Sequence, residues 1–349
     1  MDRARRFESN PLIRPADIKP SIEGAVVECV FNPGAFVYRG KTFLLMRVAE
    51  RMIQKEGVLS TLVADETQPG GARVVEFDLD DPGLDASDPR FITHDGVCYL
   101  TTLSHLRLAV SEDGVNFTPE DTPTFTGPGP LETFGIEDCR VSRIGDTFYL
   151  TFSSVSDNGV GVALRTTRDW QAFENYGMIL PPHNKDGVLF EEQIGGRFAC
   201  LHRPSGADVG GHYLWYATSP DLAHWGHHTC IARTREGLWD SQRIGAGAAP
   251  IATDKGWLAI YHGANEDSRY CLGAMLLDRD DPTRVRARSD EPIMEPVAEY
   301  EREGFFGNVV FSNGQIVDGD EVTVYYGAAD TAICAARLSV TEILDALGV

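Results

Sequence analysis

Basic residues are scarce in this sequence. Its 349 residues include 31 Lys and Arg against 52 Asp and Glu, which gives a formal net charge of −21 at pH 7. Nucleic acids and anionic membranes attract broad basic protein faces, so this balance argues against both as partners. An anionic small molecule would need a local cluster of cations inside this repelling envelope.

Long apolar runs and paired cysteines are also missing. No stretch approaches the roughly 20 apolar residues of a membrane-spanning helix, and no apolar segment of a secretory signal follows Arg3, Arg5 and Arg6. The seven cysteines are scattered without a C-x-x-C pair, and the nine histidines are dispersed, which argues against a disulfide framework and a metal site. We therefore expect a cytoplasmic protein; a homo-oligomer is compatible with these features.

What the chain does contain is a repeat. A short apolar strand, a glycine turn and a second apolar or aromatic strand recur, with turn glycines 49 to 63 residues apart at Gly40, Gly96, Gly145, Gly196, Gly256 and Gly319. A second landmark, S/T-x-D followed by an aromatic residue, recurs in phase at Asp113, Asp169 and Asp221. Such Asp and Ser/Thr side chains stabilise turns, and the aromatic residue would fill the space between neighbouring sheets.

Units of about 50 residues with four strands each are typical of a β-propeller. A two-sheet sandwich with coincidental spacing is the weaker alternative. The clearest helical signal is a short apolar stripe at residues 340–347, capped by Ser339 or Thr341. The sequence thus predicts one all-β domain over residues 1–349 with a short C-terminal helix.

Polar residues occur where the first strand of several units begins, and in a propeller these strands line the central channel. They include Asn32, Asp88, Asp138 and the Glu191–Glu192 pair. A buried carboxylate is costly unless it is paired or functional. For Asp88, pairing with Arg90 is as good an explanation as a function, whereas for Asp138 we favour a function.

A set of basic residues accompanies these carboxylates, namely Arg47, Lys185, Arg203 and His262. Each one alone is explained as an ordinary solvated charge. Several cations around one carboxylate would instead form an anion site suited to phosphate. The chain has no Walker or dinucleotide glycine loop, so such a phosphate would not belong to a nucleotide.

At these residues the sequence resembles the mannoside phosphorylases of glycoside hydrolase family 130, in particular the β-1,2-mannooligosaccharide branch. The resemblance runs almost end to end. Its main motifs are Phe31-Asn32-Pro33-Gly34, Leu45-Met46-Arg47, Ser104-His105-Leu106-Arg107, Gly135-Ile136-Glu137-Asp138, Asn184-Lys185-Asp186, Leu201-His202-Arg203-Pro204, Arg243-Ile244-Gly245, Tyr261-His262-Gly263, Arg269-Tyr270-Cys271 and Ala328-Ala329-Asp330. The resemblance implies a five-bladed propeller. The six turn glycines then require an extra hairpin inserted around residues 58–103.

The family's activity implies an inverting phosphorolysis of β-mannosides without a cofactor. Asp138 would be the general acid, acting through the 3-hydroxyl of the bound mannose, while inorganic phosphate attacks from the other face as co-substrate and releases α-mannose 1-phosphate. The resemblance assigns phosphate contacts to Arg47, His262, Lys185 and Arg203, and sugar contacts to Asn32, Glu192 and Asp330. A phosphorylase needs one acid and a cationic cradle, whereas an inverting hydrolase needs a second carboxylate about 6.5–9.5 Å away.

The sequence departs from the family pattern at three places. Cys139 replaces a proline beside the acid, Ser156 stands where one branch carries an arginine, and the usual F-P-E-K reads Phe190-Glu191-Glu192-Gln193. Because Glu191 or Glu192 could supply a base, an inverting β-mannosidase is the alternative. A non-catalytic glycan-binding propeller is the more distant alternative, which the retained acid and basic positions disfavour.

Overall fold

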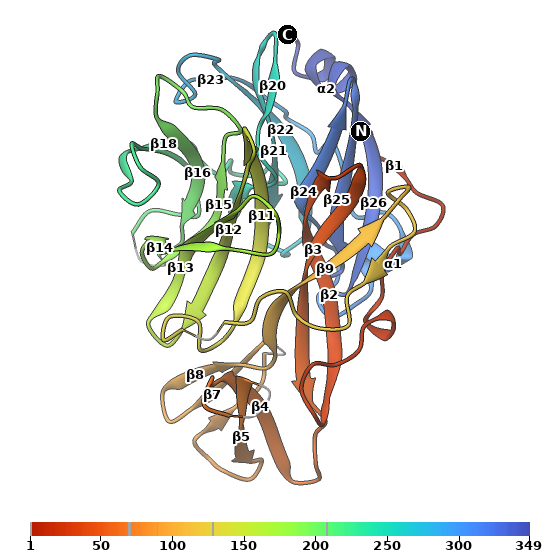
Figure 1. Ribbon diagram of the computed structural model, residues 1–349, viewed down its shortest axis with the longest axis vertical. Helices are drawn as coiled ribbons and strands as arrows, with labels where there is room; N and C mark the ends of the chain where they lie inside the picture. Colours follow the sequence, from red (N-terminus) through yellow and green to blue (C-terminus); the bar gives the residue numbers. More distant parts are fainter. Residues whose placement is uncertain (1, 69–70, 89, 128, 207–208) are drawn as a thin grey trace.

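The computed structural model describes residues 2–68, 71–88, 90–127, 129–206 and 209–349. Almost all regular structure is β, and neighbouring strands are antiparallel within five larger sheets, numbered here in chain order (Figure 1). Sheet 1 contains β2 (Ala25–Tyr38), β3 (Lys41–Met52), β9 (Leu103–Ser111) and β10 (Thr118–Pro119); sheet 2 contains β11 (Ile136–Ile144), β12 (Thr147–Ser156), β13 (Gly159–Thr167) and β14 (Glu174–Leu180). Sheet 3 contains β15 (Asn184–Leu189), β16 (Phe198–Pro204), β17 (Leu214–Ser219) and β18 (Gly226–Ala232).

The last two sheets each have one irregular feature. Sheet 4 contains β19 (Arg243–Ala246), β21 (Gly256–Ala264), β22 (Tyr270–Leu277) and β23 (Val285–Arg288), with β20 (Ile251–Thr253) also pairing with β21. Sheet 5 contains β24 (Val310–Asp318), β25 (Glu321–Ala328), β26 (Ala332–Ser339) and, from the other end of the chain, β1 (Arg5–Arg6). Asn10 reinforces this last pairing, because its side chain both donates to and accepts from the backbone of Ala335.

The predicted glycine turns fall into two groups. Gly40, Gly145, Gly196, Gly256 and Gly319 each stand at positive φ between the first two strands of the five sheets, with β20 preceding Gly256. The sixth, Gly96, lies between β7 (Phe91–His94) and β8 (Val97–Leu100). The count of six units is therefore five sheets plus an insertion.

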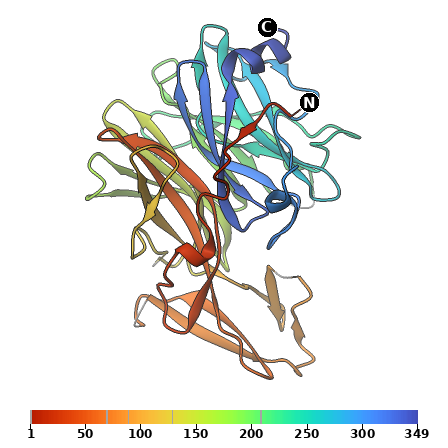
Figure 2. The same ribbon diagram turned by 90° about the vertical axis from the view of Figure 1, so that its right-hand side faces the viewer.

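The insertion lies between β3 and β9, as expected, but it is larger than one hairpin. It consists of a sheet of β4 (Val58–Ala64) and β5 (Ala72–Asp78), and a second of β6 (Leu84–Asp85), β7 and β8. Figures 1 and 2 both show these small sheets at one end of the molecule, beyond the larger sheets. Val63, next to Phe134 and Val155, packs the insertion against sheet 2.

The S/T-x-D landmarks form turns between the third and fourth strands of sheets 1, 2 and 3. In each turn the Asp carboxylate accepts hydrogen bonds from backbone N–H groups two and three residues on, as Asp113 does from Val115 and Asn116. The aromatic residue that follows contacts a neighbouring sheet, as the edge-to-face pair of Phe117 and Tyr325 shows. This prediction is confirmed.

The hydrophobic core is divided among the junctions between sheets. Each of the five largest clusters of buried apolar side chains joins two sheets: 1 with 2, 2 with 3, 3 with 4, 4 with 5, and 5 with 1. The sheets therefore follow one another in a closed order of contacts. Their first strands also touch, since β2 contacts β11 and β24, and β15 contacts β11 and β19.

Helices are short, with η1 at Pro15–Asp17, α1 at Glu299–Arg302 and α2 at Val340–Ala346. The predicted C-terminal helix is confirmed, and its cap is Ser339, whose side chain accepts from the backbone N–H of Glu342 at 3.1 Å. Ile343 anchors this helix because its side chain is fully buried in the cluster between sheets 4 and 5. Within the described residues no helix is long and apolar enough to cross a membrane.

Candidate active site

Three neighbouring first strands share one local irregularity. The pairing register shifts after Phe31 in β2, after Glu137 in β11 and after Lys185 in β15. The next residue in each case is left-handed: Asn32 at φ 45°, Asp138 at φ 52° and Asp186 at φ 56°. Asn and Asp tolerate this conformation better than most residues. Because a bulge re-aims a side chain, the repeated irregularity brings polar groups from three sheets to one place.

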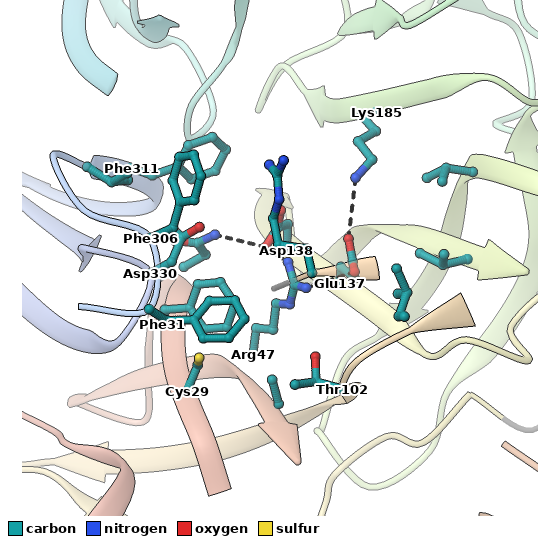
Figure 3. A pocket seen from close by; sticks show the side chains of 18 of the residues that line it. Cys29, Phe31, Arg47, Thr102, Glu137, Asp138, Lys185, Phe306, Phe311 and Asp330 are labelled. Carbon is teal, nitrogen blue, oxygen red and sulfur yellow. Dashed lines mark hydrogen bonds and ion pairs between the residues drawn. The ribbon is translucent and has the colours of Figure 1, made fainter. Parts of the chain in front are cut away.

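A fourth polar group comes from the tight turn between β25 and β26. Ala329 and Asp330 both have left-handed φ angles, 47° and 48°. Glycine, asparagine and aspartate are favoured at two successive left-handed turn positions, so Ala329 here carries backbone strain. The turn presents Asp330 to the same region as Asp138 (Figure 3).

These residues meet in a cavity of about 410 Å³. Its wall combines polar groups with aromatic ones, and the insertion closes one side with Phe91, Leu100 and Thr102. The aromatic lining residues are Phe31, Phe91, Tyr270, Phe305, Phe306 and Phe311. A mostly apolar wall with a few converging polar groups is typical of a small-molecule site.

Asp138 is almost fully buried in the wall of this cavity. Its Oδ1 accepts hydrogen bonds from Asn32 Nδ2 at 3.0 Å and from Arg47 Nη1 at 3.2 Å. Burial raises the pKa of Asp138, but the positive charges of Arg47, Arg140 and Lys185 outweigh it, so the pKa lies below its ordinary value. In the protein alone Asp138 is therefore a carboxylate at neutral pH.

Arg47 is held on every side. Its Nη2 donates to Glu137 at 2.8 Å, its Nε donates to Ser104 at 3.0 Å, and its guanidinium lies 4.6 Å from the centre of the Phe31 ring. Burial alone would lower the pKa of Arg47, but Glu137 and Asp138 raise it. Arg47 is thus a fixed positive charge beside Asp138.

Asp186 lies in a second ion-pair network. Its carboxylate receives Arg140 at 3.0 Å and Arg203 at 2.6 Å, and His262 Nε2 lies 3.3 Å away. Burial raises the pKa of Asp186, yet the positive charges of Arg203 and Arg140 hold it well below its ordinary value. Burial also lowers the pKa of His262, so its fully buried ring is neutral at pH 7.

The part of the wall from sheets 3 and 4 is basic. Lys185, Arg203, His212 and Arg243 all line the cavity there. Lys185 Nζ lies 3.4 Å from Glu137 Oε2, and Arg243 Nη1 donates to the hydroxyl of Tyr270 at 3.0 Å. Arginine and lysine side chains together can bind an anion such as phosphate.

Asp330 differs from both buried aspartates because no described residue donates a hydrogen bond to its carboxyl or forms an ion pair with it. Burial raises the pKa of Asp330 to about 7, while Arg47 lowers it and Asp138 raises it. Its protonation state therefore changes near neutral pH.

The structure brings together six of the eight site residues that the sequence suggested: Asn32, Arg47, Asp138, Lys185, Arg203 and Asp330 all line the cavity. His262 is not among the lining residues and lies behind the wall, against Asp186 and Phe311. Asp88 receives two hydrogen bonds from the Arg90 side chain, at 3.0 and 2.8 Å, as its structural interpretation proposed.

Glu192 lies outside this cavity, so the sugar contact expected of it is not supported. Its carboxylate pairs with Arg279 at 2.6 Å and is half exposed. Together with Glu191 it lines a separate cavity of about 490 Å³. The reason is its position in the chain, because β15 ends at Leu189 and Glu192 lies in the bend beyond it, at the opposite end of the strand from Lys185.

Sequence reasoning assigned no role to Glu137, His212, Arg243 and Tyr270. Arg243 and Tyr270 stand inside motifs shared with the family, which was an available signal. His212 belongs to no such motif, and its contact with Arg203 at 3.4 Å appears only in the fold. Within the described part of the chain, no group of three or more His, Cys, Asp or Glu side chains is arranged to hold a metal ion.

Comparison with known proteins gives consistent matches. Residues 89–348 match a family model described as β-1,4-mannooligosaccharide phosphorylase. The chain is 44% identical over 348 residues to a β-1,2-mannobiose phosphorylase of Listeria innocua, covering 99% of this chain and 98% of that protein. It is 39% identical over 246 residues to a 1,2-β-oligomannan phosphorylase of Thermoanaerobacter, covering 69% and 80%.

Solved structures agree with these matches. The β-1,2-mannobiose complex of the Listeria innocua β-1,2-mannobiose phosphorylase superposes with a TM-score of 0.95, over 99% of both chains at 44% identity. A family model that covers well over half of the chain and a relative that matches it end to end support the same assignment. The chain belongs to glycoside hydrolase family 130.

Proposed function

We propose that this protein is an inverting phosphorylase of β-mannosides, with β-1,2-mannobiose or a β-1,2-oligomannan as substrate and α-mannose 1-phosphate as product. The names of the Listeria innocua and Thermoanaerobacter relatives support this choice of substrate. The observation that carries the proposal is the pairing, in one cavity, of a buried aspartate with a basic wall: Asp138 with Lys185, Arg203 and Arg243.

In this mechanism Asp138 is the general acid. Its proton reaches the glycosidic oxygen through the 3-hydroxyl of the mannose, as the family resemblance implies. The bond from the anomeric carbon to that oxygen breaks while a phosphate oxygen forms a new bond on the opposite face. Lys185, Arg203 and Arg243 hold the phosphate and stabilise the charge that develops. Phosphate brings its own nucleophilic oxygen, so no catalytic base is needed.

Asn32 and Asp330 are placed to bind sugar hydroxyls in this proposal. Both line the cavity beside Asp138, and the Asp330 carboxyl is free of protein partners among the described residues. Phe31, Phe306 and Phe311 supply apolar surface on the same side in Figure 3, against which the faces of sugar rings can pack.

The two residues that could have served as the base of a hydrolase, Glu191 and Glu192, lie elsewhere. Glu191 and Glu192 line the other cavity, where the Glu191 carboxylate accepts from the backbone N–H of Arg143 and Glu192 pairs with Arg279. Neither residue lines the cavity that contains Asp138. The basic residues in that wall favour a phosphate nucleophile over water.

We also propose that residues 1–349 form one catalytic domain, a five-bladed propeller in which sheets 1 to 5 are the blades. The closed order of contacts among the sheets and the meeting of their first strands support this arrangement. A cytoplasmic location and independence from cofactors other than co-substrate phosphate remain predictions from the sequence.

The test is the dependence of turnover on phosphate. β-1,2-, β-1,3- and β-1,4-linked mannobioses are each incubated with and without inorganic phosphate, and mannose and mannose 1-phosphate are quantified. We expect phosphate-dependent cleavage of the β-1,2-linked disaccharide with one α-mannose 1-phosphate per mannose. Mannose release at the same rate without phosphate, and without mannose 1-phosphate, would refute the proposal.

A further inference from the structure

Glu137 bridges the two sides of the cavity. Its Oε1 accepts from Arg47 Nη2 at 2.8 Å, and its Oε2 faces Lys185 Nζ at 3.4 Å. Figure 3 shows the Lys185 side chain pointing at Glu137, with Arg47 and Asp138 beside it. One carboxylate thus contacts both the arginine that fixes Asp138 and the lysine of the basic wall.

The two contacts differ in strength. Arg47 is anchored by Ser104, Asp138 and Phe31 as well as by Glu137, and its side chain is 14% exposed. Lys185 is 32% exposed, and Glu137 is its sole ion-pair partner among the described residues. A lysine is a flexible point charge, so Lys185 can leave Glu137 for another anion while Arg47 stays.

The mobility of Lys185 affects Asp138, because Lys185 is one of the cations that lower the pKa of Asp138. Arg47, Arg140 and Lys185 favour its carboxylate form, whereas burial opposes it. Glu137 binds the same guanidinium as Asp138, so its negative charge also disfavours a second charge at Asp138. In the protein alone the three cations outweigh these effects, and the pKa of Asp138 lies below its ordinary value. A general acid must carry a proton when the glycosidic bond breaks, so the balance has to change when the substrates bind.

We propose that Glu137 is a positioning residue that couples phosphate binding to the acid function of Asp138. Glu137 binds Lys185 in the free enzyme and releases it when phosphate binds. This inference rests on the proposed phosphorolysis. It names Glu137 as the group through which one substrate prepares the site for the other.

The sequence of events balances in protons and charge. Hydrogen phosphate binds and draws Lys185 away, so Asp138 faces the phosphate anion and a less neutralised Glu137. Asp138 then takes one proton from the buffered solvent, and the product returns one proton to the solvent when its phosphate ester ionises. During the reaction this proton passes to the leaving oxygen as its bond to the anomeric carbon breaks and the phosphate ester bond forms. Asp138 returns to a carboxylate, and Lys185 returns to Glu137 when mannose 1-phosphate leaves.

The test variant is Glu137→Gln, which keeps an acceptor for Arg47 but removes the negative charge. We expect two opposite changes. KM for phosphate falls about two- to fivefold, because Lys185 no longer has to break a partly exposed ion pair. The alkaline limb of the kcat profile moves down by about one pH unit, because one nearby charge shifts a pKa by about 1–3 units, and kcat at neutral pH falls about tenfold.

The controls separate this role from a structural one. Glu132→Gln removes a similarly buried glutamate, paired with Arg165 at 3.5 Å outside the cavity, and should leave KM and the pH profile unchanged. Glu137→Asp keeps the charge and should restore the alkaline limb. Calorimetry of phosphate binding in buffers of different ionisation enthalpy should show a proton uptake that is lost in Asp138→Asn and reduced in Glu137→Gln.

Two results would overturn the coupling. One is a Glu137→Gln variant with a raised KM for phosphate and an unshifted pH profile; the other is proton uptake equal to that of the wild type. These results differ from those expected if the proposed function is wrong, because the wild type itself would then produce no mannose 1-phosphate. A thermal melt of Glu137→Gln that matches the wild type shows that the kinetic changes do not come from misfolding.

Discussion

Asp138 and Asp186 occupy the same position in neighbouring sheets, each left-handed at a bulge in a first strand. Their surroundings differ. Asp186 lies against three partners from three sheets, Arg140, Arg203 and His262. Asp138 has Arg47 and Asn32 on one oxygen. The same bulge therefore places a structural carboxylate, Asp186, in one sheet and a reactive carboxyl, Asp138, in the neighbouring sheet.

The neighbouring residues, rather than the position in the fold, therefore decide whether a carboxylate acts in catalysis or stabilises the structure. Replacing Asp186 leaves two buried arginines without compensation, whereas replacing Asp138 leaves Arg47 still paired with Glu137. We therefore expect Asp138 to control activity and Asp186 to control stability. Four experiments test this division of roles.

The largest effect is expected for Asp138→Asn. Asparagine adopts left-handed backbone readily, so the bulge should persist while the proton donor is lost. The initial rate of mannose 1-phosphate formation from β-1,2-mannobiose should fall roughly 10²–10⁴-fold. The free energy of unfolding, from urea titration, should change little. Activity within a few-fold of the wild type would assign the acid role to another residue.

The next effect is on folding. Asp186→Asn keeps the backbone but leaves Arg140 and Arg203 facing a neutral group in the interior. Breaking a buried ion pair by removing one partner costs about 3–5 kcal/mol, and we expect a loss of this order in the free energy of unfolding. Urea unfolding measures it, with Asp138→Asn as the matched control. Equal stability of the two variants would mean that the two networks are equivalent.

A smaller effect is expected for Lys185, which precedes Asp186 in β15 and contacts Glu137. Lys185→Met removes a charge-assisted contact to phosphate, which should raise KM for phosphate roughly tenfold or more. The KM for mannobiose should stay nearly constant. Lys55→Met, which removes an exposed lysine paired with Glu76 in the insertion, is the control. If KM for phosphate does not change, the basic wall acts without Lys185.

The smallest effect concerns Asp330, another left-handed aspartate of the cavity wall, which has neither kind of partner among the described residues. Its pKa is about 7 in the folded protein and near 3.9 in an unfolded chain, so folding favours the protonated form. The stability it contributes is complete below about pH 4 and disappears as the pH rises through about 7. Asp330→Asn should therefore flatten the fall in unfolding free energy across this range. A variant curve parallel to the wild type would contradict the raised pKa.

Local signals in the sequence predicted much of the fold. The turn glycines and the S/T-x-D turns depend on a few adjacent residues. Five of the six glycines mark a hairpin in each of the five larger sheets, and the sixth, Gly96, marks a hairpin of the insertion. The size of the insertion was harder to predict, because the sequence of a hairpin such as the one around Gly96 does not indicate whether it belongs to a large or a small sheet. The strands β4 and β5 were not predicted one by one, although their segments are rich in valine (Val58, Val63, Val74 and Val75), which favours strands.

The site was less predictable because it depends on contacts between distant strands. Asp138 and Arg47 could be expected together from family motifs, but the ties of Arg47 to Ser104 and Glu137 join residues 57 and 90 positions apart. Glu192 was assigned to the site although it lies beyond the end of β15, and the sequence does not indicate where that strand ends. His262 was assigned to phosphate although its burial places it behind the wall.

The pairing of β1 with β26 has a consequence for how the protein is made. Arg5 and Arg6 complete a sheet with Arg337 and Ala336, which the ribosome adds more than 300 residues later. At about 5–20 residues per second this delay is on the order of tens of seconds. Until then the amino-terminal strand has no partner, and the junction between sheets 5 and 1 stays open. β1 is thus among the last strands to pair, and aggregation during synthesis should depend on how well that open junction is shielded.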